Sequence, residues 1–254
     1  MKVKLLKSAF GADPGHQFLM SYLVDDCLAI DAGSIGLQSP IRVQEQIRHV
    51  FLSHSHIDHV ASLPSFLDNV YRHGPDCPTI YGSRETLESL RRDFFNDRIW
   101  PDLFRLSRGE SPFLKFQELK ARETVTAGRY RVTPIPLDHV VPTFGFVVDD
   151  GASAFAVVSD TSPSEEIWRV INATPRLKGC FLESSFPDSM EWLARESKHL
   201  TPRMFLGERR KLIPEVPVVA VHIKPAFYAE VVAELLALHE PRVEIGEPGR
   251  EYQF

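Results

Sequence analysis

Hydrophobic residues in this chain fall into short runs that are separated by turn-forming residues. Apolar runs of this length, bounded by Gly, Pro, Asn or Asp, are typical of buried strands. They predict strands at 3–10, 50–52, 79–82, 113–119, 129–137, 143–150, 153–160, 177–184 and 216–223, a hairpin over 18–33 that turns at 24–27, and a terminal strand region at 243–254. A loop over 11–17 separates the first strand from the hairpin.

Between several of these runs, apolar residues recur three and four positions apart, which predicts helices. The expected helices cover 39–48, 63–71, 83–95, 162–171, 189–197 and 227–240, with a further one starting at Thr201-Pro202. Ser83 and Thr201 are expected N-caps, and Ser162 with Glu165 resembles a capping box. Residues 101–112 look irregular.

The order of the elements predicts an α/β fold. Strand runs followed by strand–helix alternation imply sheets covered by helices, in layers. No Gly/Ser/Pro-rich linker divides the sequence, so we expect one domain over residues 1–254.

The composition and charge of the chain limit the kinds of partner that it is expected to bind. The net charge of −5, with Lys and Arg spread thinly, argues against duplex nucleic acid as the main partner but permits a small anionic substrate. Three distant cysteines make a disulfide framework improbable, and no apolar stretch reaches the roughly 20 residues that span a bilayer. A cytoplasmic protein without a membrane partner is expected, and a homo-oligomer is compatible with the sequence.

The segment FLSHSHIDHV, at 51–60, carries the most specific chemistry. His54, His56, Asp58 and His59 follow an apolar run within six positions, where a loop leaves a strand. His54 and His56 can face one ion while Asp58 and His59 turn toward a neighbouring one. Mixed imidazole and carboxylate ligands suit zinc, or else manganese or iron. The alternative is a polar loop with incidental histidines.

Other candidate ligands stand at the ends of later strands. His139, Asp160 and His222 each follow an apolar run, which places them at the rim of a core. Taken singly, each has a structural alternative, such as a capping Asp or a hydrogen-bonded interfacial His. Asp31 also ends a strand, and we expect either an acceptor that orients a ligand histidine or a turn residue before Gly33.

Together these residues resemble the metallo-β-lactamase superfamily: HSHIDH, with Asp31-Ala32-Gly33 before it and the three later candidates after it. The resemblance implies an αββα sandwich of two mixed β-sheets flanked by helices, with the site at the edge between the sheets. It implies two divalent ions, zinc by first expectation. The implied ligands are His54, His56 and His139 on one ion and Asp58, His59 and His222 on the other, with Asp160 bridging. No cysteine stands near Asp160, unlike in common zinc β-lactamases.

Three further segments are similar to the class II cyclic-nucleotide phosphodiesterases: an E-x-S-F-P-like segment at Glu183, an S-H-L-T-P-like segment at His199 and an N-D-x-x-W-P-like segment at 96–101. The sequence departs from that family at Ile57 and at Pro64-Ser65. The resemblance implies that 3′,5′-cyclic nucleotides such as cyclic AMP are hydrolysed to 5′-monophosphates by a hydroxide bridging the metals. His199 would protonate the leaving oxygen, and Glu183 would orient the imidazole of His199. The resemblance also places Asp58 among the catalytic residues.

Several alternatives remain open at this point. A tRNA 3′-processing endonuclease shares the Glu and His pair, and a lactonase or thioesterase shares the metal site. A di-iron oxygen-binding or redox-sensing protein would use the same ligands without catalysis. Phe95, Trp100 and Phe144 are either base-stacking or core residues. Lys224 either contacts a phosphate or is solvated.

Overall fold

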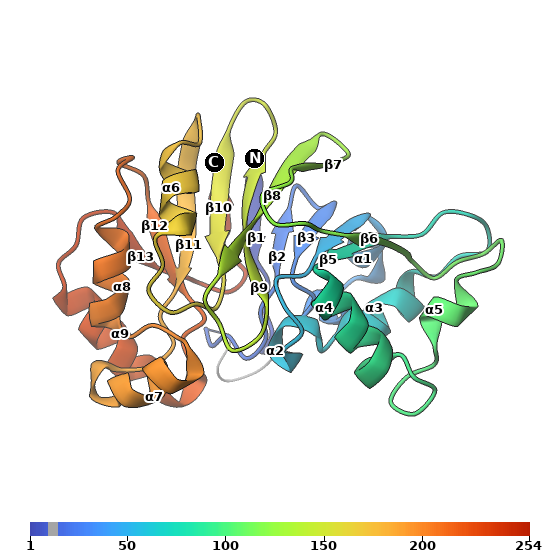
Figure 1. Cartoon of the computed structure of the whole chain (residues 1–254), viewed down its shortest axis with the longest axis horizontal. Helices are drawn as coiled ribbons and strands as arrows, with labels where there is room; N and C mark the ends of the chain where they lie inside the picture. Colours follow the sequence, from blue (N-terminus) through green and yellow to red (C-terminus); the bar gives the residue numbers. More distant parts are fainter. Residues whose placement is uncertain (10–14) are drawn as a thin grey trace.

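The computed structural model describes residues 1–9 and 15–254, and within them two seven-stranded sheets pack face to face with helices on their outer sides (Figure 1). The expected end of the first strand at Phe10, and the loop over 11–14, lie outside this range. The predicted sandwich of two mixed sheets between helices is confirmed.

The first sheet is antiparallel at one end and parallel at the other. Its strands, in spatial order, are β14 (Glu251–Gln253), β1 (Lys2–Leu5), β2 (Tyr22–Val24), β3 (Leu28–Ile30), β4 (His49–Phe51), β5 (Thr79–Gly82) and β6 (Lys115–Glu118). The hairpin predicted over 18–33 is confirmed as β2 and β3. Its turn residues Asp25 and Asp26 both have positive φ, as a tight hairpin turn requires.

The second sheet is also mixed, with its parallel part at the C-terminal end of the chain. Its order is β13 (Val243–Ile245), β12 (Val218–Val221), β11 (Leu177–Glu183), β10 (Ala154–Val158), β9 (Thr143–Asp149), β8 (Tyr130–Leu137) and β7 (Val125–Ala127). Aromatic side chains such as Phe51, Phe146 and Phe181 fill the space between the two sheets.

The helices lie outside the sheets and form a second core on each side. They are α1 (Ile41–Glu45), α2 (Ile57–Val60), α3 (Leu63–Val70), α4 (Arg84–Ser89), α5 (Leu103–Leu106), α6 (Glu166–Asn172), α7 (Glu191–Ser197), α8 (Pro202–Arg209) and α9 (Tyr228–Ala237). A π-helical turn, Leu90–Phe94, extends α4, and short 3-10 turns cover Ile35–Leu37, Asp188–Met190 and Pro225–Phe227. Among the described residues, no helix has the length and apolar character needed to cross a membrane.

The N-caps expected at Ser83 and Thr201 are confirmed. Ser83 accepts a hydrogen bond from the Thr86 amide at 3.0 Å, and Thr201 accepts one from the Met204 amide at 3.4 Å. The capping box at Ser162 is wrong, because α6 begins only at Glu166 and its N-cap side chain makes no capping bond. Residues 161–164 are not helical, because the amides of Thr161, Ser162 and Ser164 bond to other parts of the chain, such as that of Ser162 to the Asp138 carbonyl at 2.7 Å.

The remaining differences are local. The helix expected over 39–48 begins at Ile41 and ends at Glu45. The stretch 101–112 was predicted to be irregular, but it contains α5, which the Asp102 side chain caps. The short elements α2 and β7 were not anticipated from the sequence, and each spans at most four residues.

Candidate functional site

The segment 53–60 is fastened to the body of the protein on two sides. The Asp58 carbonyl accepts from the Met20 amide at 2.8 Å, and the His59 carbonyl accepts from the Ala32 amide at 2.7 Å. Gly33 lies against this segment, and a Cβ there would overlap the Asp58 carbonyl oxygen. The loop is therefore held rigidly, as the presentation of metal ligands requires.

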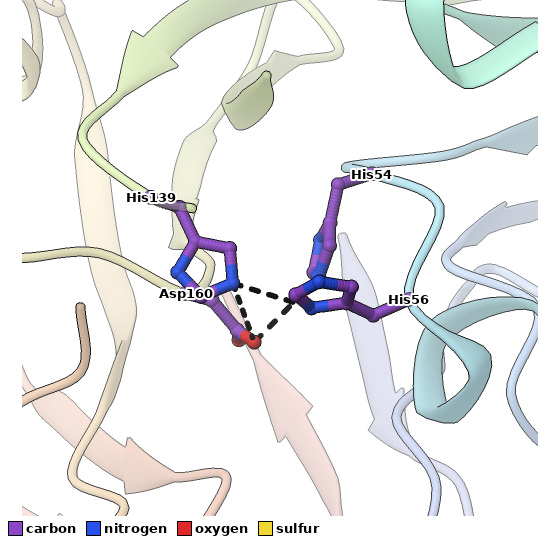
Figure 2. Close-up of side chains that lie close together, drawn as sticks. All are labelled: His54, His56, His139 and Asp160. Atoms are coloured by element: carbon purple, nitrogen blue, oxygen red, sulfur yellow. Dashed lines mark hydrogen bonds and ion pairs between the residues drawn. The ribbon is translucent and has the colours of Figure 1, made fainter. Parts of the chain in front are cut away.

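Four side chains from three parts of the chain form a first group: His54 and His56 between β4 and α2, His139 after β8, and Asp160 after β10 (Figure 2). The Nε2 atom of His139 lies 3.3 Å from Nδ1 of His56, and Nε2 of His54 lies 3.7 Å from Oδ2 of Asp160. Nε2 of His54 is buried and has no hydrogen-bond partner among the described residues. A buried nitrogen left in this state, beside other nitrogen and oxygen donors, fits a metal ion.

Asp58, His59 and His222 form a second group next to the first. Nε2 of His222 lies 3.2 Å from Oδ2 of Asp58 and 3.3 Å from Nε2 of His59. Asp160 faces both groups, since its Oδ2 is 3.4 Å from Nε2 of His59 and its Oδ1 is 3.5 Å from Nε2 of His222. The structure thus brings together all seven side chains expected as ligands, with the Asp160 carboxylate in the middle.

The far nitrogens of four histidines are held by hydrogen bonds. Nδ1 of His59 donates to Asp31 at 2.7 Å, that of His54 to the Ser53 hydroxyl at 2.9 Å, that of His139 to the Lys198 carbonyl at 3.0 Å, and that of His222 to the Ser185 hydroxyl at 2.8 Å. Each ring thereby turns the lone pair of Nε2 toward the cluster, which is the arrangement that supports a bound metal.

Of these four partners, only Asp31 was anticipated, as an acceptor that orients a histidine. The structure gives it that contact and also hydrogen bonds from the amide and hydroxyl of Ser53. Ser53 directly precedes the ligand candidate His54, and Ser185 lies two residues after Glu183. Serines are too common for such positions to indicate a role. The contribution of Lys198 is a backbone carbonyl, which no side-chain motif reveals.

The backbone is strained at two positions of the site. Asp31 has φ 60° and His222 has φ 59°, in the left-handed region that residues other than glycine rarely adopt. Both follow directly on strands, β3 and β12. Such strain is maintained where surrounding contacts fix a functional side chain, and both residues belong to the network around the cluster.

The charges of the protein side chains favour positive charge at the centre of the site. Burial opposes ionisation of Asp160, but His222 and His59 outweigh it and hold the pKa of the carboxyl well below its usual range. Burial likewise opposes a charged His59, but Asp160 and Asp31 raise its pKa well above the ordinary value. Burial lowers the pKa of His54 and of His222, which favours the neutral form that binds an ion.

Glu183 and His199 form a buried pair beside the cluster. Oε1 of Glu183 is 2.9 Å from Nδ1 of His199, and Nδ1 is 4.0 Å from Oδ2 of Asp160. Glu183 also accepts from the Thr161 amide at 2.9 Å and the Ser185 hydroxyl at 2.7 Å. Burial disfavours the imidazolium, but the carboxylate outweighs it and raises the pKa of His199. The site therefore holds a histidine beside the cluster whose protonated form is stabilised, as a general acid requires.

The residues considered for substrate contact separate into two kinds. Phe95 and Phe144 are buried, and Trp100 packs against the core beneath the helices of the first sheet. Lys224, in contrast, lies at the cluster, with Nζ 3.2 Å from Oδ2 of Asp58, and its side chain is 31% exposed. The structure thus assigns the three aromatics to the interior and Lys224 to the site.

Comparisons with known proteins agree with this architecture. The family model described as "Beta-lactamase superfamily domain" matches residues 25–223. The chain is 29% identical over 213 residues to a probable 3′,5′-cyclic-nucleotide phosphodiesterase of Yersinia pestis, covering 72% of this chain and 59% of that protein. It is 33% identical over 118 residues to ribonuclease Z of Limosilactobacillus fermentum, covering 46% and 35%.

Among solved structures, unliganded yeast PDE1 matches with a TM-score of 0.77 at 18% identity, and the match covers 98% of each chain. At that identity the likeness concerns the fold. The sequence alignments cover 59%, 53% and 53% of the length of three curated cyclic-nucleotide phosphodiesterases. This chain therefore spans little more than half the length of those proteins.

Proposed function

Because the chain belongs to the beta-lactamase superfamily, whose model matches residues 25–223, we propose that it is a two-metal phosphodiesterase. Its substrates are 3′,5′-cyclic nucleotides, with cyclic AMP as the representative, and its products are 5′-monophosphates. The observation that carries the proposal is the Glu183–His199 pair, whose Nδ1 atom lies 4.0 Å from the Asp160 carboxylate. A proton donor at this place serves an ester whose leaving group is a poor one.

The donor set fits two divalent ions. His54, His56 and His139 would hold one, Asp58, His59 and His222 the other, with Asp160 between them. Zinc is the first expectation from this mixture of imidazole and carboxylate, and manganese or iron accept the same ligands. When bound, such a pair of ions acts as a Lewis acid and makes water a nucleophile near neutral pH.

The chain's own residues supply the proton and its direction. Glu183 fixes Nδ1 of His199 by accepting its proton in a hydrogen bond, so Nε2 carries the proton that can be given away. In the proposed reaction the oxygen of water forms a bond to phosphorus and the bond from phosphorus to the ribose 3′-oxygen breaks. The ribose 3′-oxygen receives the proton of His199 Nε2, the proton that the water gives up replaces it on His199, and the product is the 5′-monophosphate.

Reconstitution separately with zinc, manganese and iron, followed by assay on cyclic AMP, tests the proposal. Bis(p-nitrophenyl) phosphate serves as a control diester, because its leaving group departs without a proton. Formation of 5′-AMP by at least one metal form is expected. Metal-loaded protein that hydrolyses neither diester would refute the proposal, and activity on the control alone would restrict it to other phosphodiesters.

The similarity to ribonuclease Z favours a second candidate, cleavage of precursor tRNA at its 3′ end. The same proton donor and metal ligands would serve an RNA diester. The net charge of −5 weighs against it, because binding tRNA depends on neutralising many phosphates. Release of a 3′ trailer from precursor tRNA, faster than the hydrolysis of cyclic AMP, would favour this candidate.

A further inference from the structure

Three aromatic side chains lie together on the His222 side of the cluster, and we call them the aromatic wall: His16, Phe18 and Tyr228. The ring centroids of His16 and Tyr228 are 4.7 Å apart, and those of His16 and Phe18 are 6.1 Å apart. Phe18 is 50% exposed, whereas the other phenylalanines that the structure describes are buried or partly buried. Its ring is therefore available to a ligand.

Gln17 ties the wall to the candidate metal cluster. It stands between His16 and Phe18 in the chain, and its Oε1 accepts a hydrogen bond from the His222 amide at 2.8 Å. His222 is itself held in a left-handed conformation. The wall therefore keeps a fixed position next to one of the proposed ligands.

The other end of the Gln17 amide has no partner among residues 1–9 and 15–254. Because the His222 amide donates to it, the bonded atom must be the carbonyl oxygen, and the free atom is Nε2, a donor. Nε2 is buried, Gln17 is 8% exposed, and no acceptor for this atom is found within the described part of the chain. A buried donor left without an acceptor destabilises the protein, unless a ligand or water supplies the acceptor.

Lys224 lies on this side of the cluster, and a cavity lies against Tyr228. Nζ of Lys224 is 3.2 Å from Oδ2 of Asp58, which puts a cation where an anionic group would approach the cluster. Tyr228, one turn further along, also lines a cavity of about 240 Å³ with Lys7, Gly15, Glu247 and Pro248. The wall thus borders free volume.

From these contacts we propose that the His222 side of the site is a nucleobase subsite. A base stacks on the exposed face of the aromatic wall, the Gln17 Nε2 amide donates to an acceptor of the bound nucleotide, and Lys224 faces its phosphate. The inference rests on the proposed phosphodiesterase function and assigns the residues that receive the base of its nucleotide substrate. Aromatic rings take any base by stacking, so the subsite selects for nucleotides more than among them.

Calorimetry on the metal-loaded full chain tests the subsite without turnover. The probes are 5′-AMP and ribose 5-phosphate, which differ only in the base. Wild type is expected to bind 5′-AMP about tenfold or more tightly than ribose 5-phosphate, in line with the usual contribution of base stacking. Phe18→Ala should reduce this ratio severalfold, and Phe18→Tyr should restore it.

Trp192→Ala is the matched control. Trp192 is 66% exposed on α7, on the same outward face as the exposed Arg195 and Glu196, and its loss should leave both affinities unchanged. Equal binding of the two probes by wild type, no detectable binding of either, or an equal loss for both probes in Phe18→Ala would overturn the subsite.

The hydrolysis of diesters separates this inference from the proposed function. Wild type that hydrolyses diesters but binds the two probes equally would retain the phosphodiesterase and lose the subsite. Wild type that prefers 5′-AMP but hydrolyses no diester would retain the subsite and lose the phosphodiesterase.

Discussion

Nδ1 of His199 lies 2.9 Å from Oε1 of Glu183, in a pair that the fold buries directly beside the Asp160 carboxylate. Glu183 ends β11, whereas His199 follows α7, so the contact depends on how these two elements pack. The carboxylate both orients the ring and stabilises its charged form. This is the relationship that the proposed general acid requires, and it leads to the first two predictions.

Replacing His199 by Ala should slow hydrolysis of cyclic AMP by roughly a hundredfold or more, because the leaving oxygen then departs without a proton. The same variant should lose much less on bis(p-nitrophenyl) phosphate, and its metal content should equal that of wild type. Steady-state rates on both substrates, with elemental analysis, provide the measurement. Full activity of the variant on cyclic AMP would show that His199 is not the acid.

The rate on cyclic AMP should fall as the pH rises through the pKa of His199, because the acid is active only while protonated. Burial lowers this pKa, but Glu183 outweighs burial and raises it, so the fall should come above the ordinary range of histidine. Glu183→Gln removes the stabilising charge and should move the fall to lower pH. Identical pH profiles of kcat for wild type and Glu183→Gln would contradict the pairing.

Replacing Ser185 by Ala should weaken metal binding by roughly 10- to 100-fold, because its hydroxyl holds Nδ1 of His222 at 2.8 Å. Ser184→Ala is the matched control, since Ser184 is equally buried and its Oγ has no hydrogen-bond partner in the described ranges. Competition against a chromogenic chelator measures both affinities. The role assigned to Ser185 fails if the two variants bind metal alike.

Asp160→Ala should abolish both turnover and the binding of a second ion, because Asp160 faces both groups of ligands. Asp93→Ala, which removes an exposed carboxylate paired with the neighbouring Arg92, should change neither. Metal stoichiometry per chain distinguishes the two variants. Two tightly bound ions in Asp160→Ala would show that the carboxylate does not bridge.

Gly33→Ala should destabilise the fold by roughly 1–3 kcal/mol, because a Cβ there would overlap the Asp58 carbonyl and crowd Met20. Gly207→Ala provides the opposite case, since that glycine lies within α8 with nothing near its added Cβ, and alanine should stabilise by roughly 0.5–1 kcal/mol. Denaturant unfolding in the presence of chelator measures both. If Gly33→Ala were as stable as the wild type, the close approach of Gly33 to the Asp58 carbonyl would be unimportant for stability.

The strands, the hairpin and the caps at Ser83 and Thr201 could be predicted from the sequence, because each depends on residues that are neighbours in the chain. The prediction of a helix start at Ser162 was wrong, because backbone amides in this segment bond to distant parts of the chain and α6 begins only at Glu166. The candidate ligands could be predicted from their order along the chain, but the role of Ser185 in holding His222 could not. Its contact with His222 joins positions 37 residues apart, and only the packing of β11 beside β12 creates it.

The same reasoning applies to the aromatic residues. Phe95 and Phe144 are conspicuous in the sequence, yet both are buried, while Phe18 is exposed beside the site. Hydrophobicity does not distinguish the two situations. What singles out Phe18 is its neighbour Gln17, whose bond to the His222 amide is known only from the fold.

A titration of metal-free protein with zinc, manganese or iron, followed by the rate of 5′-AMP formation from cyclic AMP, tests the central claim most directly. The account predicts that activity with the preferred metal increases until two equivalents per chain are bound and reaches an ordinary enzymatic rate, on the order of 10 per second. Two bound equivalents with no hydrolysis of cyclic AMP, or full activity at one equivalent, would contradict it.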